Sequence, residues 1–594
     1  MKIKISTTSS DSHQHYRRKG WYITNLFKFI FISLFLSLYA CKPHENSNDV
    51  PIPGFLNNDA YMVPHDLITP QGITPDQELG YLANFAWEEF IALNWPSTYQ
   101  PKKPIRGRAD TQKTALDFTQ YEGAPLVWQT YKHRVEVYPQ GLISFTDKGP
   151  SYSYPDYQTK FDSSPYYRYR KGLNSSPKIP QCGEYDPVSM AWATIPNTDL
   201  TNIHLLNNLD ETSEINLATM FVDGDPNAPG VAPPTGTPIW MNLPTQPRRF
   251  IYQAKANRSM FDYVQENTYY NKGVRLPAQK RTYKAVRNHG AGGNPQCPVT
   301  SANQSQVCFP HGDNNSEEEG AILIKATWRE LTLKEYNSGR YVTAEIIRYR
   351  NAKPNSGILI GGSIPFCYEI VAATPTANTL PYGLTGLHII HKTVNYPTFV
   401  FATFEQVDNL DQSKPNNQLF YYNRNSGLIN PDKQVITKRA HPISSQVNQV
   451  NQEVHQQIRQ LLQSSGLSDS VWLYYKLVGV QGHAVDAGVD ENYFLANIVT
   501  ETNEVLRSFS GTLDADAGTI NPTQLNIHKG VTSYIGGGCK GCHGNAQVGP
   551  DPASIPLDSA DEKISSDFSF ITQGAPITSP DAINQHLLKA NDPK

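Results

Sequence analysis

The sequence has no apolar run long enough to cross a bilayer as a helix. Its longest run, Phe29 to Tyr39, has 11 residues, whereas a transmembrane helix needs about 20. Beyond residue 40 the basic residues are not clustered, and over the whole chain 51 Lys and Arg are outnumbered by 54 Asp and Glu. A nucleic-acid partner is therefore not expected. The Gly-x-Ser-x-Gly, Gly-Lys-Ser/Thr and His-Glu-x-x-His motifs of α/β-hydrolases, P-loop enzymes and zinc peptidases are also missing.

An export signal accounts for the apolar run at the N-terminus. Basic residues precede the run, and it ends in Leu38-Tyr39-Ala40-Cys41, as in a signal peptide. This ending is similar to the lipobox of bacterial lipoproteins, in which the Cys is lipidated and becomes the mature N-terminus. We expect residues 1–40 to be removed, Cys41 to carry a lipid anchor in the periplasm or outer membrane, and residues 41–73 to form a polar tether. A plain secretory signal is the alternative.

The run Cys539-Lys-Gly-Cys542-His543 has the order and spacing of a c-type haem attachment site. Two thiols at this spacing can bond to the two vinyl groups of one haem, and the His that follows can supply the proximal ligand of the iron. The alternatives are a redox pair, a zinc half-site or a disulfide. No second Cys-x-x-Cys completes a zinc site, and no βαβ pattern surrounds the motif. We therefore expect one covalent haem c on Cys539, Cys542 and His543.

The remaining cysteines are even in number. The chain has seven in all, and the lipid site and the haem site account for three. In an exported protein the other four are consistent with two disulfides in three connectivities. Cys297 and Cys308 share one loop and are the local pair that we favour, which leaves Cys182 and Cys367. Free buried thiols are the alternative.

The predicted secondary structure changes near residue 440, from mainly strands to mainly helices. Thr74-Pro75-Asp76-Gln77 has the pattern of a helix start with a capping box, and Trp95-Pro96 predicts its end. Runs rich in Val, Ile, Thr and aromatic residues then predict strands at 126–137, 250–254, 321–331, 341–349, 357–360, 367–372, 388–394 and 398–404. Helical patterns return at 447–462, with Gly466 as a C-cap, and at 468–478, 491–506 and 582–589.

These patterns predict an α+β fold. We expect a β-rich main domain with an N-terminal helix over residues 74–440, built on an antiparallel sheet with long loops. A mainly helical, cytochrome c-like segment that bears the haem should follow over residues 441–594. The strands do not alternate regularly with helices, so a doubly wound sheet is not expected.

Six segments together resemble bacterial single-haem lipoproteins of the cytochrome c family. The resemblance spans most of residues 76–575, and it implies haem binding and electron transfer without naming a substrate. The segments are Phe90–Pro96, Gly386–Thr393, Phe399–Asn409, Val471–Tyr475, Cys539–His543 and Asp567–Phe570.

The second axial ligand of the iron is not evident from the sequence. All six Met residues precede the haem motif, so no downstream Met can bind the iron as in small electron carriers. An earlier Met, a Lys, a His or an open site are the alternatives. Among the candidates His65, His133, His388, His391, His455, His483 and His528 we rank His388 first. In a strand, His388 and His391 would point to opposite faces, so only one of them could face the haem.

The leading hypothesis is an exported, lipid-anchored cytochrome that exchanges electrons with a redox protein or a small-molecule donor or acceptor. The opposing hypothesis is a haem-dependent oxidoreductase of the peroxidase or oxidase type, with an open distal site. Such a pocket uses residues of the kinds of His388, Glu405 and Arg348. A surface binding module with a secondary haem is a third class. A lone His, a strand-end carboxylate and a solvated Arg also have purely structural explanations.

Overall fold

The computed structural model describes several ranges of the chain, all of them between residues 50 and 571. The ranges are 50–138, 144–146, 149–151, 160–165, 167–168, 183–186, 191–194, 202–203, 205–209, 219–223, 245–270, 274–275, 277–282, 306–351, 366–377, 379–409, 419–421, 435–436, 443–482, 526–528 and 531–533, with residues 497, 500, 539, 543, 567, 569 and 571. Residues 1–40, Cys41, Cys182, Cys297, Cys542 and the segments expected as helices at 491–506 and 582–589 lie outside these residues, apart from 497 and 500. The described residues from Ile52 onward belong to one compact unit.

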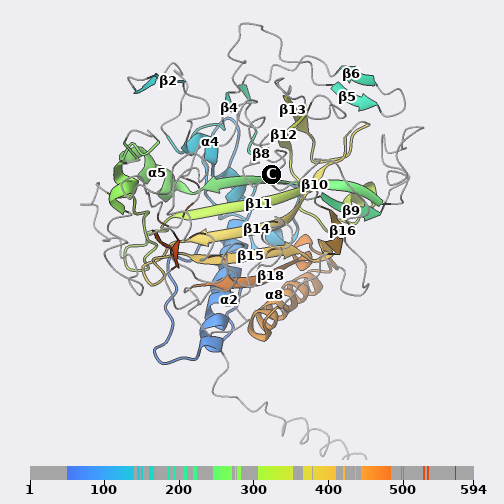
Figure 1. Ribbon diagram of the computed structural model, residues 1–594. Helices are drawn as coiled ribbons and strands as arrows, with labels where there is room; N and C mark the ends of the chain where they lie inside the picture. Colours follow the sequence, from blue (N-terminus) through green and yellow to red (C-terminus); the bar gives the residue numbers. More distant parts are fainter. Residues whose placement is uncertain are drawn as a thin grey trace, which may run out of the picture. The chain divides into compact units, whose positions relative to one another are not determined.

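A 9-stranded antiparallel sheet forms the centre of the fold (Figure 1). Its order is β17-β16-β9-β10-β11-β14-β15-β18, and β1 pairs with β10 off this path. The antiparallel α+β class predicted from the sequence is confirmed. The strands are β1 Lys132–His133, β9 Thr219–Asp223, β10 Thr245–Ala256, β11 Ile322–Glu330, β14 Tyr382–His391, β15 Val400–Gln406, β16 Leu419–Tyr421, β17 Val435–Ile436 and β18 Tyr475–Gln481.

Smaller sheets accompany the central one. In a 3-stranded sheet, β12 (Ile346–Asn351) lies between β13 (Phe366–Val371) and the parallel β8 (Asn207–Leu209). Four two-stranded ribbons pair β2 Ser144–Thr146 with β3 Gly149–Ser151, β4 Tyr167–Arg168 with β7 Asn202–Ile203, β5 Gly183–Asp186 with β6 Ala191–Thr194, and β19 Asn526–His528 with β20 Val531–Ser533.

Helix α2 (Pro75–Leu93) begins as the sequence predicts. Thr74 Oγ1 accepts a hydrogen bond from the Gln77 amide at 3.2 Å, and Gln77 Oε1 accepts one from the Thr74 amide at 2.9 Å, which completes the capping box. Most of its later residues are buried, with Trp87 and Phe90 fully so. Large apolar side chains of this kind each contribute roughly 1.5–3 kcal/mol on burial, so α2 is held mainly by its packing against the sheet.

Helix α8 (Ser445–Ser464) packs against α2 and β18 (Figure 1). Gly466 has φ +71°, and the Leu467 amide donates to Leu462 O at 2.8 Å, so the predicted glycine C-cap is confirmed. Asn451 joins three elements: its Oδ1 accepts from Trp87 Nε1 at 2.9 Å and from the Leu477 amide at 3.0 Å. The other helices are α3 Ala115–Thr119, α4 Arg134–Val137, α5 Arg258–Glu266 and α7 Leu333–Asn337, with 3₁₀ turns η1 Trp128–Thr130, η4 Val407–Asn409 and η6 Val471–Tyr474.

Two predicted elements are wrong. Residues 126–137 form η1, the short β1 and α4 rather than one strand, because side chains there bond to nearby backbone: Gln129 Oε1 accepts from the Leu126 amide at 2.9 Å, and Thr130 Oγ1 donates to Val127 O at 2.7 Å. Residues 468–478 do not form a helix. After η6 the chain continues as β18, which pairs with β15. Its Val and Tyr residues favour a strand.

The central sheet has two distinct faces. The face that we call the α2 face carries His391 and Phe404, since Phe404 lies 4.3 Å from the ring of Phe90 and His391 stacks on Phe85 at 5.7 Å. Because side chains alternate along a strand, the neighbouring residues point the other way. This opposite face, which we call the far face, is formed on β14 and β15 by His388, Ile390, Phe401, Thr403 and Glu405.

Candidate functional site

The C-terminal motif meets the central sheet on its far face. The imidazole of His543 lies 4.7 Å from the ring of Phe401 in an edge-on arrangement with an interplanar angle of 61°. Cys539 is 9 % exposed and belongs to the apolar core. Cys542 lies outside the described residues. One thiol and the imidazole of the motif therefore sit against apolar surface rather than in open solvent.

His388 lies on the same face as His543. In the β14–β15 register His388 stands opposite Thr403, and Ile390 stands opposite Phe401. His388 is therefore the diagonal neighbour of Phe401, about 7–8 Å away between Cα atoms for such pairs. Its side chain is 7 % exposed. His388, the first-ranked candidate ligand, is therefore buried on the same face of the sheet that His543 contacts.

His391 points to the α2 face and uses both ring nitrogens there. Its Nδ1 lies 2.5 Å from Glu89 Oε1, and its Nε2 lies 2.5 Å from the backbone oxygen of Glu319. Burial lowers the pKa of His391, but the hydrogen bond and charge of Glu89 outweigh burial and raise it above its usual value. The predicted opposite parity of His388 and His391 is confirmed, and His391 is not available to an iron on the far face.

The other candidate ligands that the structure describes belong to other elements, and two of them have buried partners there. His455 of α8 bonds through Nε2 to Tyr475 O at 2.8 Å and packs on Trp87, and burial lowers its pKa to about 4. Met260 is buried inside the core in α5. His133 belongs to β1 and His528 to β19, while His65 belongs to the irregular segment before α2. His483 lies outside the described residues.

The chain after the motif returns to the end of β14. Asp567 accepts from Lys392 Nζ at 2.5 Å in a buried ion pair, and the Phe309 amide donates to the same carboxylate at 2.8 Å. Burial lowers the pKa of Lys392, and the charge of Asp567 opposes that shift. Ser569 and Ile571 are buried as well. Two segments of the family resemblance, around residues 386–393 and 567–570, are therefore joined by an ion pair.

Lys392 also borders the apolar wall beside His543. Its Nζ lies 5.5 Å from the centroid of Phe399, whose ring is 6.3 Å from Phe401. Cys308 Sγ is 3.9 Å from the same nitrogen. Cys308 takes part in a disulfide, with a partner that is not among the described side chains, so its pairing with Cys297 stays a prediction. Cys367 lies in β13.

His311 is a residue of this region that the sequence did not single out. Burial, together with the charge of Lys392, lowers its pKa to about 3. The only signal in the sequence was its position three residues after Cys308. The imidazole of His311, on the loop that leads into β11, is therefore uncharged at neutral pH.

The residues considered for a peroxidase-type pocket are only partly brought together. Glu405 shares the far face with His388 as its diagonal neighbour across the β14–β15 pair, and it is 1 % exposed. Arg348 belongs to β12 in the 3-stranded sheet, where it stands opposite Glu369. The three residues therefore do not share one sheet.

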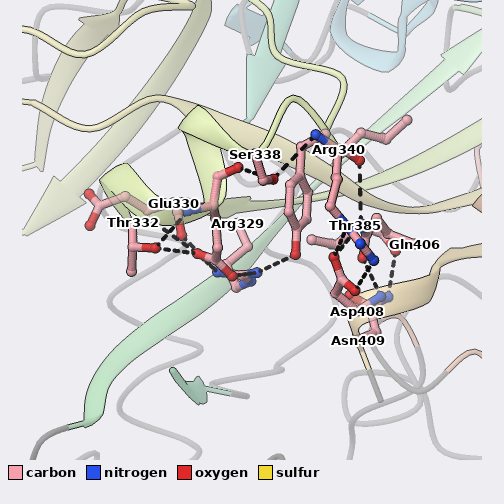
Figure 2. A network of polar contacts seen from close by, with 12 residues as sticks. Arg329, Glu330, Thr332, Ser338, Arg340, Thr385, Gln406, Asp408 and Asn409 are labelled. Carbon is pink, nitrogen blue, oxygen red and sulfur yellow. Dashed lines mark hydrogen bonds and ion pairs between the residues drawn. The ribbon is translucent and has the colours of Figure 1, made fainter. Parts of the chain in front are cut away.

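The segment Phe399–Asn409 of the family resemblance has a structural role at its end. Figure 2 shows Asp408 held by Arg340, whose Nε donates to Asp408 Oδ2 at 2.8 Å, while Gln406 Oε1 accepts from the Asp408 amide at 2.6 Å. Nearby, the buried Arg329 forms a two-pronged pair with Glu335 at 2.7 and 3.1 Å. These contacts fix the ends of β11 and β15 rather than build a site.

Comparisons with known proteins leave the family open. No family model, no curated protein and no solved structure matches the chain. Within the described ranges, no helix is both long and apolar enough to cross a membrane. The same ranges contain no group of three or more His, Cys, Asp or Glu side chains arranged to hold a metal ion. The Cys539–His543 motif and the surface that it contacts are therefore the features that bear on function.

Proposed function

We propose that the protein is an exported c-type cytochrome that is anchored by lipid at Cys41, carries one haem on Cys539, Cys542 and His543, and transfers electrons. The observation that supports this proposal most directly is the position of His543 against Phe401, together with the burial of Cys539. A solvated redox pair would not require an apolar wall. A porphyrin would, because apolar surroundings control access of water and tune the iron.

The residues present suit such a group. Phe401 and Ile390 supply apolar surface on the far face, and the ring of Phe399 lies beside Phe401. His543 supplies an imidazole for the iron, and the iron, when bound, changes its charge by one unit. The Lys392–Asp567 pair holds the chain after the motif against the sheet. The protein thus contributes binding, orientation and exclusion of water, as proteins do for most cofactors.

His388 is our proposal for the second axial ligand. It shares the far face with His543, whereas the imidazoles of His391 and His455 lie on the α2 side. A second imidazole would close the site and favour electron transfer over reaction with small molecules. The redox partner would be a protein or a small-molecule donor or acceptor.

Replacing His388 by Ala should convert a six-coordinate, low-spin iron into a high-spin one that binds carbon monoxide when reduced. Absorption spectra of oxidised and reduced protein measure this change. His455→Ala is the matched control, because it removes another buried imidazole from the α2 side and should leave the spectrum unchanged. A high-spin spectrum in the unaltered protein would reject His388 as a ligand.

A high-spin spectrum in the unaltered protein would favour the second candidate, a haem-dependent oxidoreductase with an open distal site. The presence of His388 and the buried Glu405 on one face supports this candidate. These two groups could then hold and move a proton near a bound small molecule. The position of Arg348 in another sheet counts against a pocket of all three residues.

Replacing Cys41 by Ser should release the protein from the membrane, because several acyl chains contribute roughly 0.8 kcal/mol for each buried methylene and the anchor would be lost. Fractionation of cells, with immunodetection of the protein in membrane and soluble fractions, measures the effect. A variant that stays in the membrane fraction would contradict lipid anchoring at this residue, whatever the state of the haem.

A further inference from the structure

Glu89 and His391 form a buried pair on the α2 face, directly behind the surface that His543 contacts. Both side chains are fully buried, and Glu89 Oε1 lies 2.5 Å from His391 Nδ1. Glu89 comes from α2, and His391 is the last residue of β14. The backbone oxygen of Glu319 closes the other side of the imidazole at 2.5 Å from Nε2.

The chemistry of these contacts determines where protons can be. A backbone carbonyl only accepts, so His391 Nε2 must carry a proton. Nδ1 then either donates to the Glu89 carboxylate or accepts from the Glu89 carboxylic acid. In both cases one proton lies between the two side chains, and the pair is neutral overall. This neutrality explains how two titratable groups can be stable without exposure to water.

Glu89 has room for one more proton. Its second oxygen, Oε2, is buried and has no hydrogen-bond partner. Burial raises the pKa of Glu89, against the hydrogen bond and charge of His391. A proton on Oε2 would convert the pair into a carboxylic acid beside an imidazolium, and the Nδ1 proton could still be donated to Oε1. The pair can therefore hold either one or two protons without losing its central contact.

Two charged residues close to the pair, Glu319 and Lys392, have partners of their own. The Glu319 carboxylate accepts from Asn257 Nδ2 at 2.9 Å and from the Tyr131 hydroxyl at 3.4 Å, and burial raises its pKa. Further titratable or charged residues on the packed elements include Asp76, Glu78 and Glu88 of α2, Lys325, Arg329 and Glu330 of β11, His388 and Lys392 of the β14 region, Glu405 of β15, His311 and Glu318 of the loop before β11, Lys132, His133 and Arg134 near β1, Lys255 of β10, and His65. Lys392 pairs with Asp567 rather than with Glu89.

The pair is only one residue along the strand from the proposed haem surface. His391 follows Ile390, which stands opposite Phe401, and Phe401 contacts His543. One sheet therefore separates the pair from the motif. A change of one charge on the far face acts on the pair through the protein interior, where charges interact more strongly than in water.

We propose that the Glu89–His391 pair is a proton-binding site that takes up one proton from water when the haem is reduced and releases it on oxidation. This inference rests on the proposed function. A one-electron donor supplies the electron to the ferric iron, and the proton adds to Glu89 Oε2, so that the added charge is compensated. Reduction makes the far face more negative and raises the affinity of the pair for a proton, so the reduction potential should fall as the pH rises.

The test is a potentiometric titration of the full-length, haem-loaded protein between about pH 5 and pH 9. The potential of the unaltered protein should fall with rising pH over part of this range. Glu89→Gln keeps the size of the side chain and removes the proton site, so its potential should lose at least half of that dependence. The matched control is Glu88→Gln on the same helix, which should keep the dependence although burial and Glu89 raise the pKa of Glu88 to about 7.

An unaltered protein whose potential does not vary with pH would overturn the inference, and so would an unchanged slope in Glu89→Gln. If that variant does not fold, infrared difference spectra of the unaltered protein decide: reduction should add or shift the band of a buried carboxylic acid, and an unchanged carboxylic acid region would also overturn the inference. A preparation without haem absorption would instead refute the proposed function, and the proton site as a redox-linked device with it.

Discussion

A variant in which Ser replaces both Cys539 and Cys542 should contain no covalently bound haem. The thioether bonds need two sulfurs at this spacing, and a hydroxyl does not replace them. The expected loss is complete: the intact mass should equal that of the polypeptide, and the reduced protein should show no cytochrome absorption. Cys539→Ser alone should leave a single thioether and a lower yield of loaded protein.

Cys41→Ser is the matched control for that experiment, because it also removes a thiol but should leave haem attachment intact. Both variants should be matured in a host that attaches haem to another cytochrome in the same culture. Unaltered protein with the mass of the bare polypeptide would contradict the proposed function. It would favour a redox pair or a disulfide at Cys539 and Cys542.

Replacing Glu136 by Ala should lower the free energy of unfolding by about 3–5 kcal/mol, the usual cost of leaving a buried charge without its partner. Arg106 donates to Glu136 through both terminal nitrogens at 2.8 and 2.9 Å, and its side chain is fully buried. Lys132 lies 3.4 Å from the same carboxylate. Urea unfolding at neutral pH measures the change.

The effect of Glu136 should depend on pH with a definite sign. Burial alone would raise the pKa of Glu136, but the charges of Arg106 and Lys132 outweigh burial and hold it well below its usual range. A carboxyl whose pKa is lower in the folded state stabilises the fold above its unfolded pKa of about 4.3, and the stabilisation is lost as the pH falls through the folded value. The difference between the variant and the unaltered protein should therefore be full at pH 7 and shrink below about pH 4.

Lys113→Ala provides the control for this measurement. Lys113 pairs with Asp117 at 3.4 Å, but both side chains are roughly two-fifths exposed, at 43 % and 39 %. Exposed pairs of this kind contribute less than about 1 kcal/mol. A loss in Glu136→Ala no larger than in Lys113→Ala would mean that the buried charges near β1 do not stabilise the fold.

Several local features were predictable from short stretches of sequence. The capping box at Thr74 and Gln77 and the glycine after α8 depend only on neighbouring residues, and both are found as expected. The strands β10, β11, β13 and β15 follow from runs of β-branched and aromatic residues. The Cys539–His543 motif is likewise local, since its chemistry depends on the spacing of adjacent residues. Local hydrogen bonds and local steric preferences explain the agreement at the helix ends and in these strands.

Other features depended on contacts between distant parts of the chain. Residues 475–481 became a strand because β15 offered an edge for pairing, although the preceding residues favoured a helix. Alternation along β14 separated His388 from His391, but which face received α2 and which received His543 was decided by packing. The proton pair of Glu89 and His391 joins residues 302 positions apart. Local sequence therefore specified several helix ends, several strands and the Cys-x-x-Cys-His motif. The surface that the motif contacts and the buried pair behind it arose only from long-range packing, because burial and strand register are properties of the whole fold.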